Sequence, residues 1–545
     1  MFLGLLRFRF RCYKRKWLLG FTMALVFGGL QTSLAVDLSA QELSARVDYW
    51  IDTALSQRDQ PLGMVCDDAS FLRRVTLDLT GRQPSAYEVD QFLRDSREDK
   101  RAVTIDRLLA SPSSAVHLAN IWSAWLLPET LDVGLAQQRA GLHQWLRERF
   151  AKNLRYDRLV ADLLVTAGSG NTGPGAFYIS LEGKPEKLAA KTARVFMGIQ
   201  LDCAECHDHP FDHWKQRDFW GLAAYFARLS LGGMQNQGGM VEIVDTPTGE
   251  VRLPTTQDVV APQPLVATGL SGLTSGTRRQ QLALWLTARE NPYLARAVVN
   301  RCWSHLFGRG LVEPIDDMRA SQLASHPELL DELAQSFVAS EFDLRGLLRA
   351  LVNSRAYQRS TASALPVPGS QSTETDNYAT MPHKPLTAWQ MATCLQQVAR
   401  EISGEPAQAR IQALAQQLGK LRGDNSRATL GVVQALVTMH SDQLNPVYNP
   451  TDSRLLQALS APHLDHEQRI YWLFLSTLCR PPRADELAAL RQLEPGTQDV
   501  TDDGAESSKT AVTEPNRAEP DAIRATWQSD LLWALVNSTE FAMTP

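Results

Sequence analysis

The residues best suited to chemistry lie close together near position 205. Cys203, Cys206 and His207 form the arrangement Cys-x-x-Cys-His, which is the attachment pattern of c-type haem. In such sites two thiolates form thioether bonds with the haem vinyl groups, and the adjacent imidazole becomes the proximal iron ligand. The spacing predicts a helical turn that places Cys203 and His207 on one face and ends at Pro210. We therefore expect Cys203, Cys206 and His207 to hold haem c, with His207 on the iron.

The same residues support two other kinds of site. His209 and His213 follow the cysteines, so the segment also offers thiolate and imidazole ligands for zinc, although the spacing matches no standard zinc finger. Cys203 and Cys206 could instead form a structural or redox-active disulfide. The sequence alone does not decide among haem, zinc and a disulfide without any cofactor.

A haem iron at His207 would take a second axial ligand from another part of the chain. His213 and three methionines are the candidates, because imidazole nitrogen and thioether sulfur both bind haem iron: Met197, Met234 and Met240. His209 lies only two residues from His207 and is not expected to reach the opposite face of the same iron. The sequence does not choose among these ligands.

The first 35 residues have the features of a secretory signal peptide. A basic stretch between Arg7 and Lys16 is followed by an apolar run, Trp17–Leu30, and by the small residues of Ser33–Ala35. The apolar run is shorter than the roughly 20 residues that a helix needs to span a bilayer. We therefore expect cleavage after Ala35 rather than retention as a membrane anchor, and export to the periplasm or cell envelope. No later segment has the pattern of a transmembrane helix.

The composition is that of a globular protein. The chain has 545 residues, of which 44% are hydrophobic and 21% charged, and this is enough for several domains with large cores. A disordered protein, a collagen and a small disulfide scaffold are excluded. The formal net charge of −5 argues against nucleic-acid binding, and seven cysteines are too few for a disulfide framework.

Apolar residues recur at helical spacing along most of the chain, for example in Glu98–Ala110. We expect a mainly α, multi-helical protein with two domains, residues 40–228 and residues 276–545. Two stretches rich in Ser, Thr, Pro, Gly and acidic residues, near 360–377 and 495–520, are expected to be mobile.

A small β-hairpin insertion is expected between the two helical domains, within residues 229–275. Residues 241–244 and 250–253 alternate in hydrophobicity, and the turn-forming residues 245–249 separate them. Val259–Val266 adds a further short β-like stretch. The sequence therefore predicts that 241–244 pairs with 250–253.

Two pairs of segments repeat each other within the chain. Leu347–Tyr357 matches Leu531–Phe541, and both predict a helix that ends in Asn-Ser before an aromatic residue. Arg82–Glu88 matches Arg480–Glu486, and in each an Arg-x-Pro turn precedes a new helix. We interpret these as recurring helical-hairpin units. Convergent helix-end signals are the alternative explanation.

Two further pairs of residues have weaker signals. Asp316 and the next aspartate follow a proline and could bind a cation, although a solvated turn or a helix start is the expected structure. Cys302 and His305 lie one helical turn apart among apolar residues. We expect both in the core rather than on a metal.

Several long motifs resemble one known family. The first half of the chain is similar to the planctomycete cytochrome-associated family called domain of unknown function 1549, in the segments Phe71–Arg82, Ile105–Pro112 and Cys203–Phe211. The second half resembles its usual companion, domain of unknown function 1553, in the segments Ala297–Trp303, Leu306–Val312, Ser325–Leu330 and Leu351–Tyr357.

The resemblance implies an exported protein whose biochemical activity is unassigned. Proteins of this kind often carry a separate N-terminal cytochrome c module, which this chain is expected to lack because the family motif at Phe71 follows soon after the predicted cleavage site. A role for haem then rests on Cys203, Cys206 and His207. Neighbouring genes commonly encode another exported protein, so the resemblance also implies an exported protein partner.

Three hypotheses of function follow. The first is a c-type-cytochrome-like protein that passes electrons to a partner. The second is a helical scaffold or binding module at the cell envelope, whose cysteine and histidine loop is stabilised by zinc or a disulfide. The third is a metal-dependent enzyme that acts on a polymer. The sequence indicates no substrate, no redox partner and no oligomeric state.

Overall fold

The first half of the chain forms a series of short helices. The computed structural model describes residues 38–128, 136–170, 173–232, 241–268, 275–319, 322–361, 377–399, 413–414, 416–418, 444–493 and 520–545. Its first helices are α1 (Ala40–Ser56), α2 (Asp68–Thr80), α3 (Ala86–Arg94), α4 (Lys100–Leu109), α5 (Pro112–Leu126), α6 (Ala136–Ala151), α7 (Tyr156–Leu164), α8 (Gly175–Ser180), α9 (Pro185–Thr192) and α10 (Gln216–Ala223). Between α9 and α10 lie a π-helix (Ala193–Met197) and a 3-10 helix (Asp202–Glu205).

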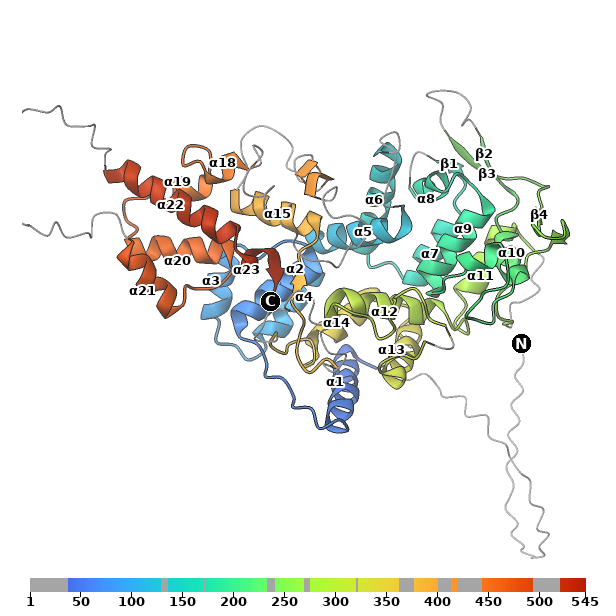
Figure 1. The fold of residues 1–545 in the computed structure, drawn as a ribbon, viewed down its shortest axis with the longest axis horizontal. Helices are drawn as coiled ribbons and strands as arrows, with labels where there is room; N and C mark the ends of the chain where they lie inside the picture. The colour runs from blue at the N-terminus through green and yellow to red at the C-terminus, as the bar shows by residue number, and fades with distance from the viewer. Residues whose placement is uncertain are drawn as a thin grey trace, which may run out of the picture. The chain divides into compact units, whose positions relative to one another are not determined.

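The second half is also mainly helical, which confirms the predicted fold class (Figure 1). Its helices are α11 (Arg278–Leu286), α12 (Leu294–Phe307), α13 (Pro327–Ala339), α14 (Leu344–Asn353), α15 (Ala388–Ala399), α18 (Asn445–Tyr448), α19 (Arg454–Leu459), α20 (His466–Thr477), α21 (Ala484–Gln492), α22 (Pro520–Val536) and α23 (Thr539–Ala542). Within the described ranges, no helix is long and apolar enough to cross a membrane.

Some of the predicted features lie outside the described residues. These are the signal peptide at 1–35, residues 362–376 and 494–519 of the two stretches expected to be mobile, and the candidate ligands Met234 and Met240.

The helix boundaries follow local signals in the sequence. Ser85 and Glu88 form a capping box at the start of α3, in which each side chain bonds the other residue's backbone N–H. Gly308 ends α12 with φ +78°, a left-handed conformation that a residue without Cβ adopts at low cost. Local chemistry therefore sets where these helices begin and end.

The strands are short and antiparallel. They are β1 (Gly168–Ser169), β2 (Leu229–Gly232), β3 (Glu242–Asp245), β4 (Val251–Arg252) and β5 (Val259–Val260). β1 lies within the first half, and the next four lie at or after its end. A further pair, β6 (Lys384–Pro385) and β7 (Met543–Thr544), lies near the end of the chain.

The predicted pairing of residues 241–244 with 250–253 is wrong. β3 is the central strand of a three-stranded sheet and pairs with β1 on one side and β2 on the other. Both of its edges are therefore occupied, so β4 pairs with β5 instead. The region does contain small antiparallel strand pairs between the helical halves, as expected.

Helices from both halves share one large hydrophobic core. α1 packs against α13 and α14, α2 packs against α5, and the fully buried Trp122 and Trp303 belong to the same cluster. From Val36 to Pro545 the chain forms a single unit. The predicted domain limits at 228 and 276 thus lie within one continuous core, and they stay predictions.

A second core is formed by the last helices of the chain. α18 to α22 gather together in Figure 1, and Leu395, Leu456, Leu473 and Leu532 pack among them. Leu77 of α2 also belongs to this cluster. α2 therefore contributes to both cores and connects them.

The two predicted helical-hairpin units have matching contacts. Arg82 donates to the carbonyl oxygen of the next residue and to both carboxylate oxygens of Glu88, and Arg480 makes the same set of bonds with Glu486. The residue before each arginine is left-handed, with φ +69° at Gly81 and +58° at the equivalent cysteine.

The two helix ends of the repeat also match. The Ser354 hydroxyl accepts the Tyr357 N–H at 3.2 Å, and the Ser538 hydroxyl accepts the Phe541 N–H at 3.2 Å. Similar sequence therefore gives similar local structure in both copies, as the interpretation of recurring units requires.

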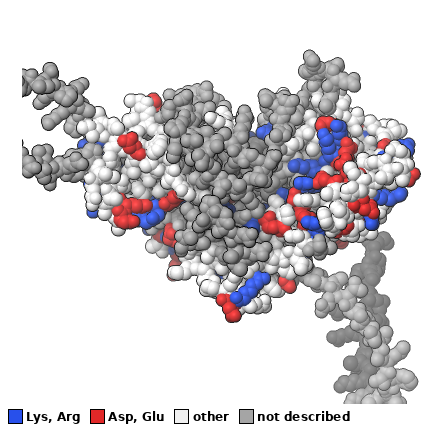
Figure 2. All heavy atoms as spheres, viewed as in Figure 1, with Lys and Arg blue, Asp and Glu red and all other residues white. Residues whose placement is uncertain are grey.

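Basic and acidic side chains are interspersed on the face seen in Figure 2. Many oppositely charged side chains among the described residues form ion pairs, for example Arg46 with Glu332 and Arg278 with Glu250.

Candidate functional site

The helix in the segment that contains Cys203, Cys206 and His207 is shorter than predicted. The 3-10 helix spans Asp202–Glu205, and Cys206 caps it with φ −99° and ψ −33°. The helix thus ends before His207 and not at Pro210, and the predicted i, i+4 helical relationship between Cys203 and His207 does not form. A 3-10 helix has three residues per turn, so Cys203 and Cys206 lie on the same side of it.

Side chains of α10 explain why the helix ends early. The Gln216 amide donates to the carbonyl oxygens of Cys206 at 2.8 Å and Glu205 at 3.2 Å. The Trp220 indole N–H donates to the Glu205 carbonyl at 3.0 Å. These carbonyls would otherwise accept bonds from a further helical turn. The α10 side chains therefore hold the segment in its bent form.

The loop that follows is closed by hydrogen bonds at its base. The His209 N–H donates to the Trp214 carbonyl at 2.8 Å. Asp208 accepts the backbone N–H of Gln216 at 3.0 Å and the Lys215 ammonium at 3.1 Å, and these bonds lower the pKa of its carboxyl group. The loop is therefore tethered at both ends to the start of α10.

Both cysteines are free thiols with exposed side chains. His207 is exposed as well, and its Nδ1 lies 2.8 Å from the Asp208 carbonyl oxygen. Since a carbonyl oxygen only accepts, Nδ1 carries the proton in this bond, and the Nε2 lone pair is left for another partner. The three residues predicted to hold haem are thus all accessible in one short segment.

The other predicted ligands are arranged less favourably. His209 Nδ1 accepts the Phe211 N–H at 3.2 Å, and His213 Nδ1 lies 2.7 Å from the Asp212 carboxylate, so both rings have local partners. Met197 is fully buried in the core. Within the described part of the chain, no three or more His, Cys, Asp and Glu side chains are grouped closely enough to hold a metal ion.

Comparison with known protein families gives two matches. Residues 46–230 match PSCyt2, described as a protein of unknown function (DUF1549), and residues 278–426 match PSD1, described as a protein of unknown function (DUF1553). The chain therefore contains a DUF1549 region followed by a DUF1553 region. The order of the two regions is the one predicted from the motifs, and β3, β4 and β5 lie between them. No curated protein and no solved structure matches the chain.

A polar cluster joins the DUF1549 region to the DUF1553 region next to the cysteines. Arg194 pairs with Asp202, the residue before Cys203, and its Nη1 lies 3.5 Å from Oδ2 of Asp316. Gln200 donates to the other oxygen of Asp316 at 2.9 Å. We call Arg194, Gln200, Asp202 and Asp316 the Arg194 bridge.

The surroundings of the Arg194 bridge fix its position. Burial opposes the charge of Arg194, but the bonds to Asp202 outweigh this effect, and the pKa of Arg194 is raised. Arg301 of α12 donates to the Arg194 carbonyl at 2.7 Å, and the Met318 N–H donates to the Gly198 carbonyl at 2.7 Å. The DUF1553 region thus holds the backbone that leads into Cys203.

Sequence reasoning missed most of this cluster. Arg194 and Gln200 are not among the candidate residues. Asp316 does lie in a turn, as predicted, but its carboxylate is half-buried and bonds across to the other region. The only available signal was the adjacent pair of aspartates after a proline, which names no partner. The prediction for Cys302 is confirmed, because it is 2% exposed. His305 is half-buried, and its Nε2 bonds the Asp78 carbonyl at 2.9 Å.

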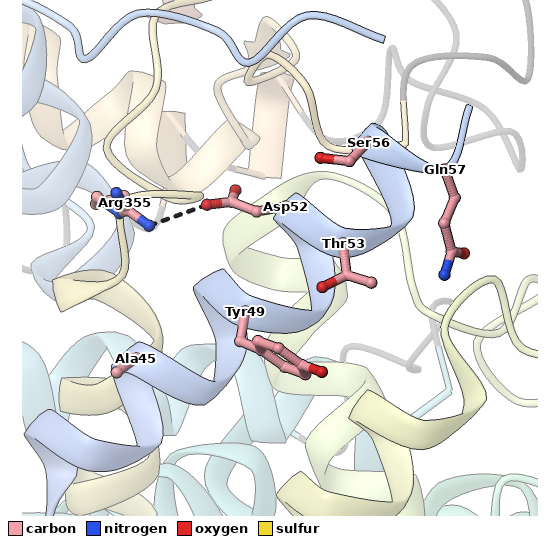
Figure 3. A pocket seen from close by; sticks show the side chains of 7 residues that line it. All are labelled: Ala45, Tyr49, Asp52, Thr53, Ser56, Gln57 and Arg355. Carbon is pink, nitrogen blue, oxygen red and sulfur yellow. Dashed lines mark hydrogen bonds and ion pairs between the residues drawn. The ribbon is translucent and has the colours of Figure 1, made fainter. Parts of the chain in front are cut away.

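A separate cavity of about 600 Å³ runs along α1. Figure 3 shows the ion pair between Arg355 and Asp52 beside it, with Tyr49 and Thr53 on the same helix. None of the cysteines or histidines of the candidate haem segment lines it. It therefore forms no part of the site around Cys203.

Proposed function

We propose that this protein is an exported c-type-cytochrome-like protein of the periplasm or cell envelope. Haem c is attached through Cys203 and Cys206, His207 is the proximal ligand, and electrons pass to an exported protein partner. One observation carries this proposal: two free, exposed thiols lie one 3-10 turn apart, directly before an imidazole whose Nδ1 already bonds a backbone carbonyl.

The chemistry of these residues fits haem attachment. Thioether bonds need accessible thiols, and both cysteines are exposed. A proximal histidine needs a free Nε2 and a fixed ring, and the bond from Nδ1 to the Asp208 carbonyl supplies both. Haem, when bound, would supply one-electron redox chemistry.

The rest of the segment positions these groups. Gln216 and Trp220 hold the carbonyls of Glu205 and Cys206, so the two cysteines keep their relative position. Phe211 is 75% exposed and offers an apolar side chain at the surface of the same loop. An exposed site of this kind is accessible to a protein partner.

Zinc fits the arrangement less well. A structural zinc site takes four ligands, whereas the described residues contain no group of three or more His, Cys, Asp and Glu side chains placed to hold a metal ion. The second candidate function is therefore a helical scaffold whose loop carries a disulfide. It is supported by the recurring helical-hairpin units, because such units also build binding surfaces.

Expression with an active cytochrome c maturation system tests the proposal. We expect a Soret band and an intact mass increased by one haem, both lost in a Cys203→Ser, Cys206→Ser double variant. His207→Gln should disturb the Soret band, while His463→Gln, an exposed histidine far from the segment in sequence, is the matched control. A colourless protein at the mass of the bare polypeptide would overturn the proposal and favour the scaffold.

A further inference from the structure

A cavity of about 340 Å³ lies where α2 meets the last helices of the chain. Three arginines line it: Arg73 of α2, and Arg480 and Arg483 from the turn before α21. The hydroxyl-bearing residues Ser70 and Thr539 also line it. We propose that this cavity binds a small oxyanion, either a carboxylate or a phosphate.

Arg73 is a buried cation without a carboxylate partner among the described residues. Its side chain is 3% exposed, and its guanidinium donates to the carbonyl oxygens of Thr477 at 3.0 Å and Phe541 at 2.8 Å. Its Nε–H is buried and has no hydrogen-bond partner. A buried charge is costly unless an opposite charge offsets it. An anion in the adjoining cavity supplies that charge.

The rim of the cavity adds positive charge. Arg480 is paired with Glu486 and Glu540, and Arg483 lies 3.4 Å from the same Glu540 carboxylate. Three guanidinium groups therefore face the carboxylates of Glu486 and Glu540, which leaves one positive charge unbalanced. The C-terminal Pro545, which also lines the cavity, is paired with Arg74 and does not change this balance. Arg483 is 60% exposed, so it can turn toward a ligand without unfolding its surroundings.

The chemistry of the lining selects the class of ligand. The Nη groups of Arg73 and Arg480 already donate to protein oxygens. Arg483 is therefore the guanidinium that can turn to bind a carboxylate or phosphate through two parallel hydrogen bonds, and the hydroxyl groups add further donors. Ala69 and Leu478 form an apolar part of the cavity wall beside the arginines. The cavity therefore suits a compact oxyanion, with room for a short apolar part.

Thermal unfolding of the full chain at constant ionic strength tests this site. Inorganic phosphate and acetate are titrated in separate arms, and sodium chloride is the ionic-strength control. We expect phosphate, acetate or both to raise Tm in a saturable way that chloride does not reproduce. The arm that saturates at the lower concentration identifies phosphate or carboxylate as the preferred ligand.

A pair of arginine variants locates the effect. Arg483→Gln should raise the apparent dissociation constant about tenfold, the effect of losing one charge-assisted hydrogen bond. Arg491→Gln is the matched control, because this arginine lies near the other end of α21, outside the cavity lining, and pairs with Glu467. The absence of a rise in Tm with either anion, or a rise that Arg483→Gln leaves unchanged, would overturn the proposal. The haem proposal does not depend on this result.

Discussion

Arg194 and Asp316 form an ion pair across the two family regions, with 3.5 Å between Nη1 and Oδ2. Arg194 also pairs with Asp202, directly before Cys203. The DUF1553 region therefore restrains the backbone segment that leads into the proposed haem site. This relationship makes the stability of the cysteine segment depend on a residue far away in the sequence.

Loss of Asp316 should loosen the segment before Cys203. Asp316→Asn weakens the pair with Arg194 and removes one carboxylate charge, so backbone hydrogen exchange of residues 198–206 should become several times faster. Global stability should fall by only about 0.5–1 kcal/mol, as expected for a partly exposed ion pair. Hydrogen exchange with mass spectrometry measures both. Asp258→Asn, in an exposed loop, is the control, and equal exchange in the two variants would contradict the role of the bridge.

Gly81 should tolerate no side chain. Its φ is +69°, and a Cβ added there would lie 2.4 Å from His117 Nδ1. Gly81→Ala should therefore destabilise the protein by about 2–4 kcal/mol, through left-handed strain and a clash in the core. Denaturant unfolding checks this. At Gly232 a Cβ would first meet an atom at 3.8 Å, so Gly232→Ala should cost less than about 1 kcal/mol.

The stability of the protein should fall as the pH falls from 7 to 4. Burial, with the nearby charges of Arg58 and Arg309, lowers the pKa of His326 from 6.5 to about 4, and its side chain is 5% exposed. Between these pH values the unfolded chain binds a proton at this histidine and the folded chain does not, so acid favours unfolding by roughly 3 kcal/mol.

His326→Gln should flatten this pH dependence. Denaturant unfolding from pH 7 to pH 4 gives the slope for each protein, and His463→Gln, an exposed histidine, should keep the slope of the parent. Burial also lowers the pKa of His117 and His305, so part of the slope should remain in every variant. An unchanged slope in His326→Gln would refute the assignment.

The helix caps of the two repeated units should contribute similar amounts to the free energy of unfolding. Ser354→Ala and Ser538→Ala each remove a hydroxyl that accepts a backbone N–H at 3.2 Å. Each should lower the free energy of unfolding by about 1 kcal/mol. Unfolding of the two single variants under the same conditions measures this, and a large cost at one site with none at the other would argue against equivalent units.

Local features of this fold could be predicted, and partners distant in sequence could not. The capping box at Ser85, the helix end at Gly308 and the repeated Arg-x-Pro turns depend on neighbouring residues, which a sequence displays directly. The pairing of β3 failed because two strands already occupy its edges, and one of them, β1, comes from much earlier in the chain.

The candidate site likewise has features that the sequence shows and features that depend on distant residues. The types and spacing of Cys203, Cys206 and His207 are visible in the sequence, but the early end of their helix depends on Gln216 and Trp220 of α10. The bond between Arg194 and Asp316 depends on how two family regions pack together. Neither could be found from periodicity or composition.

The most direct test of haem attachment is the mass of the peptide that contains Cys203 and Cys206. The protein is exported from a host with an active cytochrome c maturation system and digested without reduction, and the peptides are measured by mass spectrometry. Our account predicts one peptide that carries both cysteines and one covalently bound haem. Recovery of that peptide only as free dithiol or disulfide, from a host that matures a control cytochrome, would contradict it.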